Sequence, residues 1–137
     1  MADKPFATGH CLCGAVSFTI HAEPIATGQC HCKDCQRASG TGHMSIARFR
    51  KEDVAFGGQT ASYASTADSG NVNTRHFCPK CGSRLFGENS VHPGVINVSV
   101  GCVNEHDWFV PQRVVFAGSR PNWDVTATDV PNFERMP

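Results

Sequence analysis

The sequence predicts a mostly β fold, on three observations: frequent turn residues, short alternating apolar segments and little helical periodicity. Glycine and proline recur every several positions along the 137-residue chain, which is typical of short strands joined by turns. Hydrophobic residues make up 40% of the composition and charged residues 18%, as in a globular domain. We therefore expect one domain over residues 1–137, because this length suits a single core.

The first strands are expected in the first half of the chain. Val16, Phe18 and Ile20 alternate with polar residues, which predicts a half-buried strand. Segments 55–56 and 62–64 flank a pair of glycines, and this arrangement predicts a hairpin.

The rest of the chain predicts two further strands, a short helical turn and an irregular tail. Residues 95–100 are rich in β-branched side chains, as strands are, and residues 112–116 predict another strand. A helical turn is expected over 33–38, ended by Gly40. The tail over 123–137 contains two prolines and is expected to be irregular.

Charge composition argues against several classes of partner. Lysine plus arginine and aspartate plus glutamate each total 12, and no basic stripe is visible, so we expect no nucleic-acid partner. Residues 1–6 contain no apolar signal core, and no segment has the length needed to cross a membrane. We therefore expect a cytoplasmic protein with reduced cysteines and no membrane partner. Exposed sheet edges would permit a homodimer.

The cysteine spacing is the most informative feature of the sequence. Close pairs in tight turns are what a tetrahedral metal site needs, and reduced cysteines in such groups indicate metal binding. We expect seven of the eight to bind metal rather than form disulfides. The groups are a C-x-C pair, a C-x-C-x-x-C triple, a C-x-x-C pair and a lone residue: Cys11 and Cys13; Cys30, Cys32 and Cys35; Cys78 and Cys81; Cys102.

The two pairs predict a closed structural site. Cys11, Cys13, Cys78 and Cys81 would supply four thiolates to one ion and tie an early strand to a later one. Gly82 after the second pair supports the tight turn that such a site requires.

The triple predicts a different kind of site. Cys30, Cys32 and Cys35 lie within six positions and can ligate one zinc while leaving its fourth position open. An open position is typical of catalytic zinc, because it can accept water or a substrate thiol. A thiol bound to zinc is deprotonated and becomes a nucleophile at neutral pH.

Three motifs resemble the glutathione-dependent formaldehyde-activating enzyme / centromere protein V family. The motifs are GHCLCGAVSF at 9–18, CHCKDCQRASG at 30–40 and FCPKCGSRL at 77–85. The tail over 119–133 also looks like that of the family, so the resemblance covers about 9–133 and nearly the whole chain.

The resemblance implies a zinc-stabilised β-tent fold of small antiparallel sheets with two Zn2+ ions per chain. It implies a structural zinc on Cys11, Cys13, Cys78 and Cys81 and a catalytic zinc on Cys30, Cys32 and Cys35. The implied activity is that of a carbon–sulfur lyase, which reversibly joins formaldehyde and glutathione as S-hydroxymethylglutathione. The implied partners are therefore a small-molecule thiol and an aldehyde.

The chemistry needs a proton donor and, for glutathione, cationic groups that meet carboxylates. Sequence proximity to the triple suggests His31, Ser39 and His43 as donors to the nascent alkoxide. The cationic candidates near the motifs are Lys33, Arg37, Arg48 and Arg75. Of these, Arg75 is expected by default to be a solvated strand residue.

Simpler interpretations stand beside these predictions. His31, His43 or Cys102 could close the triple, which would make the protein a non-enzymatic zinc module for protein contacts. His31 lies between two ligands, so its side chain is expected to point away from the metal, towards a supporting partner or the surface.

Several other residues are expected to have ordinary structural roles. Cys102 is expected to be a small buried side chain in an apolar strand, with a redox nucleophile as the alternative. His76 is expected to be exposed or hydrogen-bonded. Four aromatic residues are expected in the core by default: Phe49, Tyr63, Phe86 and Phe116.

Overall fold

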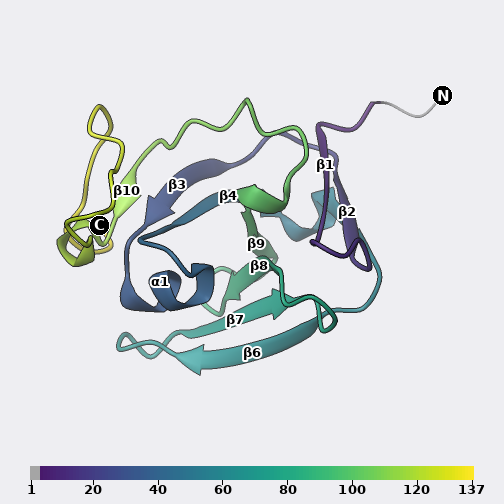
Figure 1. The fold of residues 1–137 in the computed structure, drawn as a ribbon, viewed down its shortest axis with the longest axis horizontal. Coiled ribbons are helices and arrows are strands. Elements are labelled where there is room, and N and C mark those ends of the chain that lie inside the picture. The colour runs from purple at the N-terminus through teal and green to yellow at the C-terminus, as the bar shows by residue number, and fades with distance from the viewer. Residues whose placement is uncertain (1–3) are drawn as a thin grey trace.

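Two β-sheets and one short α-helix form the described part of the protein, residues 4–137 of a computed structural model (Figure 1). The chain is 39% strand and 12% helical, which confirms the predicted all-β class. The elements are β1 (Ala7–His10), β2 (Ser17–Ile20), β3 (Ala26–Cys30), α1 (Lys33–Ser39), β4 (Met44–Arg50), β5 (Val54–Gly57), β6 (Ala61–Thr66), β7 (Val72–Phe77), β8 (Arg84–Asn89), β9 (Val95–Ser99) and β10 (Val114–Val115). Short 3-10 turns cover Lys51–Asp53, Val100–Cys102 and Ala117–Ser119.

The smaller sheet has the order β1-β2-β5, and both of its strand pairs are antiparallel. Its strand β2 confirms the strand predicted from the alternation of Phe18 and Ile20, because both side chains are buried. Figure 1 shows this sheet at the end of the molecule where the described chain begins.

The larger sheet has seven strands in the order β10-β3-β4-β9-β8-β7-β6. All of its neighbouring pairs are antiparallel except β10 and β3, which run parallel. The strands β9 and β10 lie within the segments predicted as strands, although β10 has only two residues.

Side chains from both sheets meet in one core. Ile20 comes from the smaller sheet, whereas Phe49, Leu85 and Ile96 come from three strands of the larger one, and all four are fully buried. Tight burial of such side chains contributes about 1.5–3 kcal/mol each to folding. The core therefore holds the two sheets in a fixed relation.

The predicted hairpin around the two glycines is wrong. β5 pairs with β2 in the smaller sheet, whereas β6 pairs with β7 at the edge of the larger one. The chain passes from one sheet to the other at Gly58, whose φ of +93° suits glycine. A Cβ at this position would lie 2.2 Å from the carbonyl oxygen of Ala15, so the glycine is required for a close crossing rather than a hairpin turn.

The helical turn predicted over 33–38 is confirmed as α1 (Figure 1). Cys32 caps its first turn, because the Cys32 sulfur accepts a hydrogen bond from the Cys35 backbone N–H at 3.3 Å. Gly40 ends the helix in the left-handed conformation at φ 77°. The cap brings two cysteines of the triple together.

Some default assignments need correction. Tyr63 is 66% exposed on the edge strand β6, so it is not a core residue, whereas Phe49 and Phe86 are buried as expected. Cys102 lies on a 3-10 turn rather than a strand and is only half-buried. The tail is irregular as predicted, and no helix within residues 4–137 has the length and apolar character to cross a bilayer.

Gly9→Ala is expected to destabilise the fold by about 1–3 kcal/mol, because the added methyl group has no space. Its carbon would lie 2.2 Å from the Phe18 ring and 2.4 Å from the Cys102 carbonyl oxygen. The measurement is urea unfolding followed by tryptophan fluorescence. Gly101→Ala is the matched control, since nothing lies within 4 Å of its Cβ position. Equal unfolding midpoints for the two variants would contradict this account of the β1 packing.

Candidate metal centres

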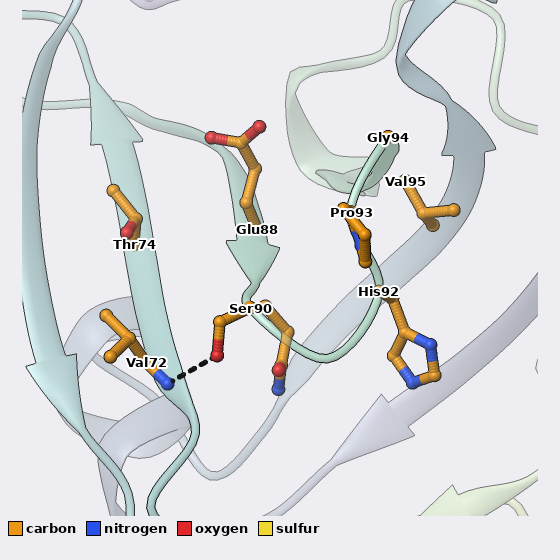
Figure 2. Close-up of a pocket in the computed structure, with 9 residues that line it drawn as sticks. Val72, Thr74, Glu88, Ser90, His92, Pro93, Gly94 and Val95 are labelled. Carbon is orange, nitrogen blue, oxygen red and sulfur yellow. Dashed lines mark hydrogen bonds between the residues drawn. The ribbon is translucent and has the colours of Figure 1, made fainter.

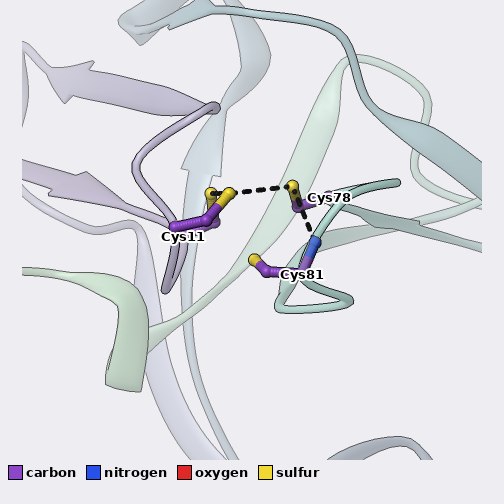
Figure 3. A group of neighbouring side chains, drawn as sticks. Cys11, Cys78 and Cys81 are labelled. Carbon is purple, nitrogen blue, oxygen red and sulfur yellow. Dashed lines mark hydrogen bonds between the residues drawn. The ribbon is translucent and has the colours of Figure 1, made fainter.

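Four cysteine sulfurs from two distant loops converge at the junction of the sheets (Figure 3). Cys11 and Cys13 lie after β1, and Cys78 and Cys81 lie after β7; all four sulfurs are within 4.8 Å of one another. The sulfurs of Cys11 and Cys13 are 3.7 Å apart, and those of Cys13 and Cys78 are 3.8 Å apart. Sulfurs on a tetrahedron around zinc, each about 2.3 Å from the ion, would be about 3.8 Å apart. The geometry fits such an ion.

Backbone amides around this four-cysteine group point at sulfur. The Val16 N–H donates to the Cys11 sulfur at 3.3 Å, and two N–H groups of the second turn donate to the Cys78 sulfur at 3.4 Å. Hydrogen bonds of this kind stabilise thiolates, which are the form that binds metal. The loops are therefore built around negatively charged sulfur.

Proton sharing separates the pKa values of these thiols. The Ser83 hydroxyl and backbone lower the pKa of Cys81 to about 5. The Ala15 N–H favours the Cys13 thiolate, but burial and the three neighbouring thiols raise the pKa of Cys13 to about 11. Four thiols this close cannot all lose protons without a cation between them. The donor set therefore fits a divalent metal ion.

The second group consists of Cys30, Cys32 and Cys35, whose sulfurs also lie within 4.8 Å of one another. Cys30 ends β3, Cys32 caps the N-terminus of α1 and Cys35 lies in its first turn, so one strand-to-helix connection positions all three. Cys30 is buried, but Cys32 and Cys35 are half-buried. The two cysteines on the side of α1 are thus partly open to solvent.

Without a cation, these three thiols hold one negative charge among them. Hydrogen bonds from Cys30 and Cys35 lower the pKa of Cys32 to about 2. The same contacts act in the opposite direction on Cys30, where bonding to Cys32 and Cys35 raises the pKa. A divalent ion would allow all three to ionise, since it replaces the shared protons.

None of the sequence candidates for a fourth ligand joins this three-cysteine group within residues 4–137. His31 and His43 belong to a separate cluster with Asp124. The Cys102 sulfur donates to the Arg84 carbonyl oxygen at 3.3 Å. Among the described residues, no histidine, aspartate, glutamate or further cysteine joins Cys30, Cys32 and Cys35 as a possible fourth ligand.

The His31 side chain is fully buried, so the surface location considered for it is wrong, and its ring bonds elsewhere in the protein. Nδ1 lies 2.9 Å from the Gly42 carbonyl oxygen and 3.2 Å from Asp124 Oδ2, so it carries the proton. Nε2 then accepts from the Thr126 hydroxyl at 3.1 Å. Burial lowers the pKa of His31, which keeps the ring neutral.

His43 completes a polar cluster behind the cysteine loop. Its Nδ1 donates to Asp124 Oδ2 at 2.7 Å, and its Nε2 lies 3.4 Å from the Gln29 side-chain amide. Both nitrogens of each histidine are thus already hydrogen-bonded within the protein. We interpret this third group of possible metal ligands as a hydrogen-bonded clamp that fixes the tail against the loop around His31. No spacing pattern in the sequence singles out Asp124.

The cationic candidates are distributed unevenly around the site. Lys33 and Arg37 lie exposed on α1, and Arg48 bonds Asn97 across the sheet at 3.2 Å. Burial lowers the pKa of Arg48. Arg75 is half-buried, and its guanidinium bonds Ser65, so the expectation of a solvated side chain is wrong. His76 is hydrogen-bonded as expected, to Glu88 at 2.7 Å.

A pocket of about 260 Å³ opens at the opposite end of β7 and β8 from the cysteine turn (Figure 2). Its lining includes Val72, Glu88 and His92 but no cysteine. The Val72 N–H donates to the Ser90 hydroxyl at 2.9 Å within it. The pocket therefore lies apart from both cysteine groups and contributes no group to their chemistry.

The family model described as glutathione-dependent formaldehyde-activating enzyme matches residues 6–119. The chain belongs to this family. The family assignment indicates an enzyme of the formaldehyde-activating type, and it covers both cysteine groups.

Two other proteins are similar to this family member, one in sequence and one in structure. A Halomonas elongata protein, named by inference as a glutathione-dependent formaldehyde-activating enzyme, is 27% identical over 121 residues, which are 84% of this chain and 77% of the relative. A crystal structure of a Rhodobacter sphaeroides protein has a TM-score of 0.58 and 22% identity, covering 76% of this chain and 96% of that one. At this identity the structural similarity concerns the fold alone.

Cys78→Ser is expected to remove one metal ion per chain and to lower the free energy of unfolding by about 3 kcal/mol or more, since metal binding and folding are coupled in closed thiolate sites. Metal content by mass spectrometry and thermal melting measure both effects. Cys102→Ser is the control, because Cys102 belongs to neither group and a serine hydroxyl can keep its bond to the Arg84 carbonyl. The same metal content in both variants would refute the four-cysteine site.

Asp124→Ala is expected to cost about 1–3 kcal/mol of stability, because it leaves the half-buried N–H of His43 without its acceptor and takes one of two acceptors from the fully buried N–H of His31. Urea unfolding measures the change. Asp129→Ala serves as control, since Asp129 is exposed in the same tail. An effect no larger than that of the control would mean that the cluster does not fix the tail.

Proposed function

We propose that the protein is a zinc-dependent carbon–sulfur lyase that adds a thiol to a small aldehyde. Glutathione and formaldehyde are the substrates that the family description suggests. The product would be S-hydroxymethylglutathione or a related thiol adduct. We assign the reaction to the cytoplasm, where thiols stay reduced.

The observation that carries this proposal is the three-cysteine group with no fourth protein ligand among residues 4–137. Three sulfur donors suit zinc, and a site with three protein ligands leaves one position for a reactant. The half-buried position of Cys32 and Cys35 supports access from solvent. A purely structural site would be closed by a fourth protein ligand instead.

We assign two zinc ions to the chain. Cys11, Cys13, Cys78 and Cys81 would hold a structural ion, because four sulfurs leave no position for a reactant. Cys30, Cys32 and Cys35 would hold the catalytic ion. When bound there, zinc supplies a Lewis acid that lowers the pKa of a thiol held beside it.

The bond changes of the proposed reaction are simple. The substrate thiol loses its proton to solvent, and its sulfur forms a bond to the aldehyde carbon. The π electron pair of the carbonyl moves to oxygen, which then takes a proton, so that a hemithioacetal results and nothing is oxidised or reduced. The three cysteines would hold the ion without reacting themselves, and a thiol positioned beside the aldehyde lowers the entropic part of the barrier.

Solvent is the proton source that the described residues favour. His31 is buried, and both of its ring nitrogens are occupied. The Ser39 hydroxyl lies 3.4 Å from the Gln36 carbonyl and accepts from the Thr41 N–H at 3.2 Å. The bonds of His43 go to Asp124 and Gln29. These three sequence candidates therefore serve structure in the described conformation.

Cys32→Ser is expected to reduce the reaction to its uncatalysed rate and the metal content from two ions to one. The assay is exchange of labelled formaldehyde with glutathione, followed by NMR, because the reaction also proceeds slowly in solution. A panel of other thiols and aldehydes, run on the same zinc-loaded protein, identifies the preferred pair.

Cys102→Ser is again the matched control and is expected to retain both ions and full activity. Wild-type protein that holds two zinc ions but accelerates none of these reactions would overturn the proposal. Activity that persists in Cys32→Ser would remove the three-cysteine group from the mechanism.

A further inference from the structure

Two arginines lie on one face of neighbouring strands beside the three-cysteine group. Arg75 of β7 pairs with Gly87 of β8, and Phe77 pairs with Arg84, with a register shift between these two pairs. Residues 75 and 77 of a strand share a face, and cross-strand partners share it too. Arg75 and Arg84 therefore project from the same side of the sheet.

Gly87 makes room for one of the two guanidinium groups. A Cβ at this position would lie 2.8 Å from Arg84 Nη2, so the Arg84 side chain extends over Gly87. Gly87 is the cross-strand partner of Arg75, and the Arg84 side chain therefore extends toward Arg75. The register shift omits Leu85 from the pairing and is what turns Arg84 to this face.

Neither guanidinium forms an ion pair with a carboxylate within residues 4–137. Arg84 donates only to the Ser99 hydroxyl at 3.3 Å, and Arg75 donates to the Ser65 hydroxyl at 3.3 Å. The Nε atoms of both side chains are buried and have no hydrogen-bond partner among the described residues. The two positively charged guanidinium groups thus lie close together in a region that is partly shielded from water.

Such an arrangement is costly unless negative charge lies nearby. Burial of an unpaired ion costs several kcal/mol, and a second ion of the same sign adds repulsion. Burial lowers the pKa of Arg84 and so does Arg75, whereas the charges of Cys35, Cys30 and Cys32 oppose this shift. Strand register gives the same placement: Ser99, which bonds Arg84, pairs with Ile46 of β4, and Cys30 pairs with Met44 two residues along the same strand. Ser99 and Cys30 therefore lie on one face of the sheet, and the three thiols are the anionic groups on the side of Arg84.

We infer that Arg84 and Arg75 are the counter-charges of an anionic fourth ligand, a thiolate, at the three-cysteine group. This inference rests on the proposed function, because it assumes a divalent ion on Cys30, Cys32 and Cys35. The ion and three thiolates together carry one net negative charge. A thiolate in the open position raises this to two, which the two guanidiniums balance.

This charge balance distinguishes between candidate fourth ligands of the ion. A neutral fourth ligand, such as water or a histidine ring, would leave one buried guanidinium without compensation. Arginine also suits this role better than lysine, because its charge is permanent and delocalised over five donors. Arg84 and Arg75 act in this scheme as positioning residues that favour the ionised form of the thiol.

The test is thiol binding by the full chain loaded with cobalt, whose absorption changes when a thiolate joins its ligands. 2-Mercaptoethanol is the probe, because it carries no carboxylate. Arg84→Gln is expected to weaken binding at fixed pH about tenfold or more, and Arg84→Lys is expected to restore most of the affinity. Arg50→Gln is the control, since Arg50 is exposed and already paired with Glu52 and Asp53.

Metal content and the thiol-free absorption spectrum report whether each variant keeps its site. If Arg84→Gln does not fold, Arg75→Gln carries the same test with the same expected weakening. Equal affinity in the arginine variants and the control would overturn the inference. Loss of glutathione binding with unchanged 2-mercaptoethanol binding would overturn it as well, in favour of carboxylate recognition.

The outcomes separate this inference from the proposed function. Wild-type protein that binds the thiol but accelerates no thiol–aldehyde reaction would refute the lyase activity and leave the role of the arginines standing. Wild-type protein that binds two ions but no thiol would refute the inference, because no anionic fourth ligand would then exist.

Discussion

The fold depends on four sulfurs meeting at one point. Cys13 and Cys78 lie 65 positions apart in sequence, yet their sulfurs are in contact, and the loops that carry them belong to different sheets. Repulsion between crowded thiolates would oppose this meeting, so the junction needs a cation or retained protons. The two sheets are also connected through their shared apolar core, in which Ile20 of the smaller sheet and Phe49 of the larger one are both buried. In a protein of this size one modest core gives limited stability, so a junction of this kind adds a substantial share of the free energy of unfolding.

Much of this architecture could be predicted from local patterns. Alternation identified β2, β-branched residues identified β9, and the end of α1 at Gly40 followed from helix-stop chemistry. The cysteine groups were predictable because ligands of one ion must lie close together, and short spacings achieve this. The hairpin prediction failed because a pair of glycines signals a turn but does not say which sheet the next strand joins. That choice is made by distant partners in β2 and β7.

Single residues in the candidate site were harder to predict than groups. Asp124 stands alone in an irregular tail, and only the fold brings it to His31 and His43. Arg84 follows a cysteine turn in sequence, where a charged residue normally faces water, but the register shift in β8 turns it inward. Charges that lie far from their partners in sequence leave no local pattern, so their role becomes visible only in three dimensions. The same holds for Arg75, whose Nε has no hydrogen-bond partner within residues 4–137.

The clamp on His31 has a consequence for the order of events during synthesis. Thr126 and Asp124 are made about ninety residues after the histidine that they hold, so the loop carrying Cys30 and Cys32 leaves the ribosome without its support. Until then the contacts of His31 with Thr126 and Asp124 are missing, so the neighbouring thiols are expected to be more accessible to oxidation or to other metals. An ion bound by these cysteines, as we propose, would stabilise the loop before the tail arrives.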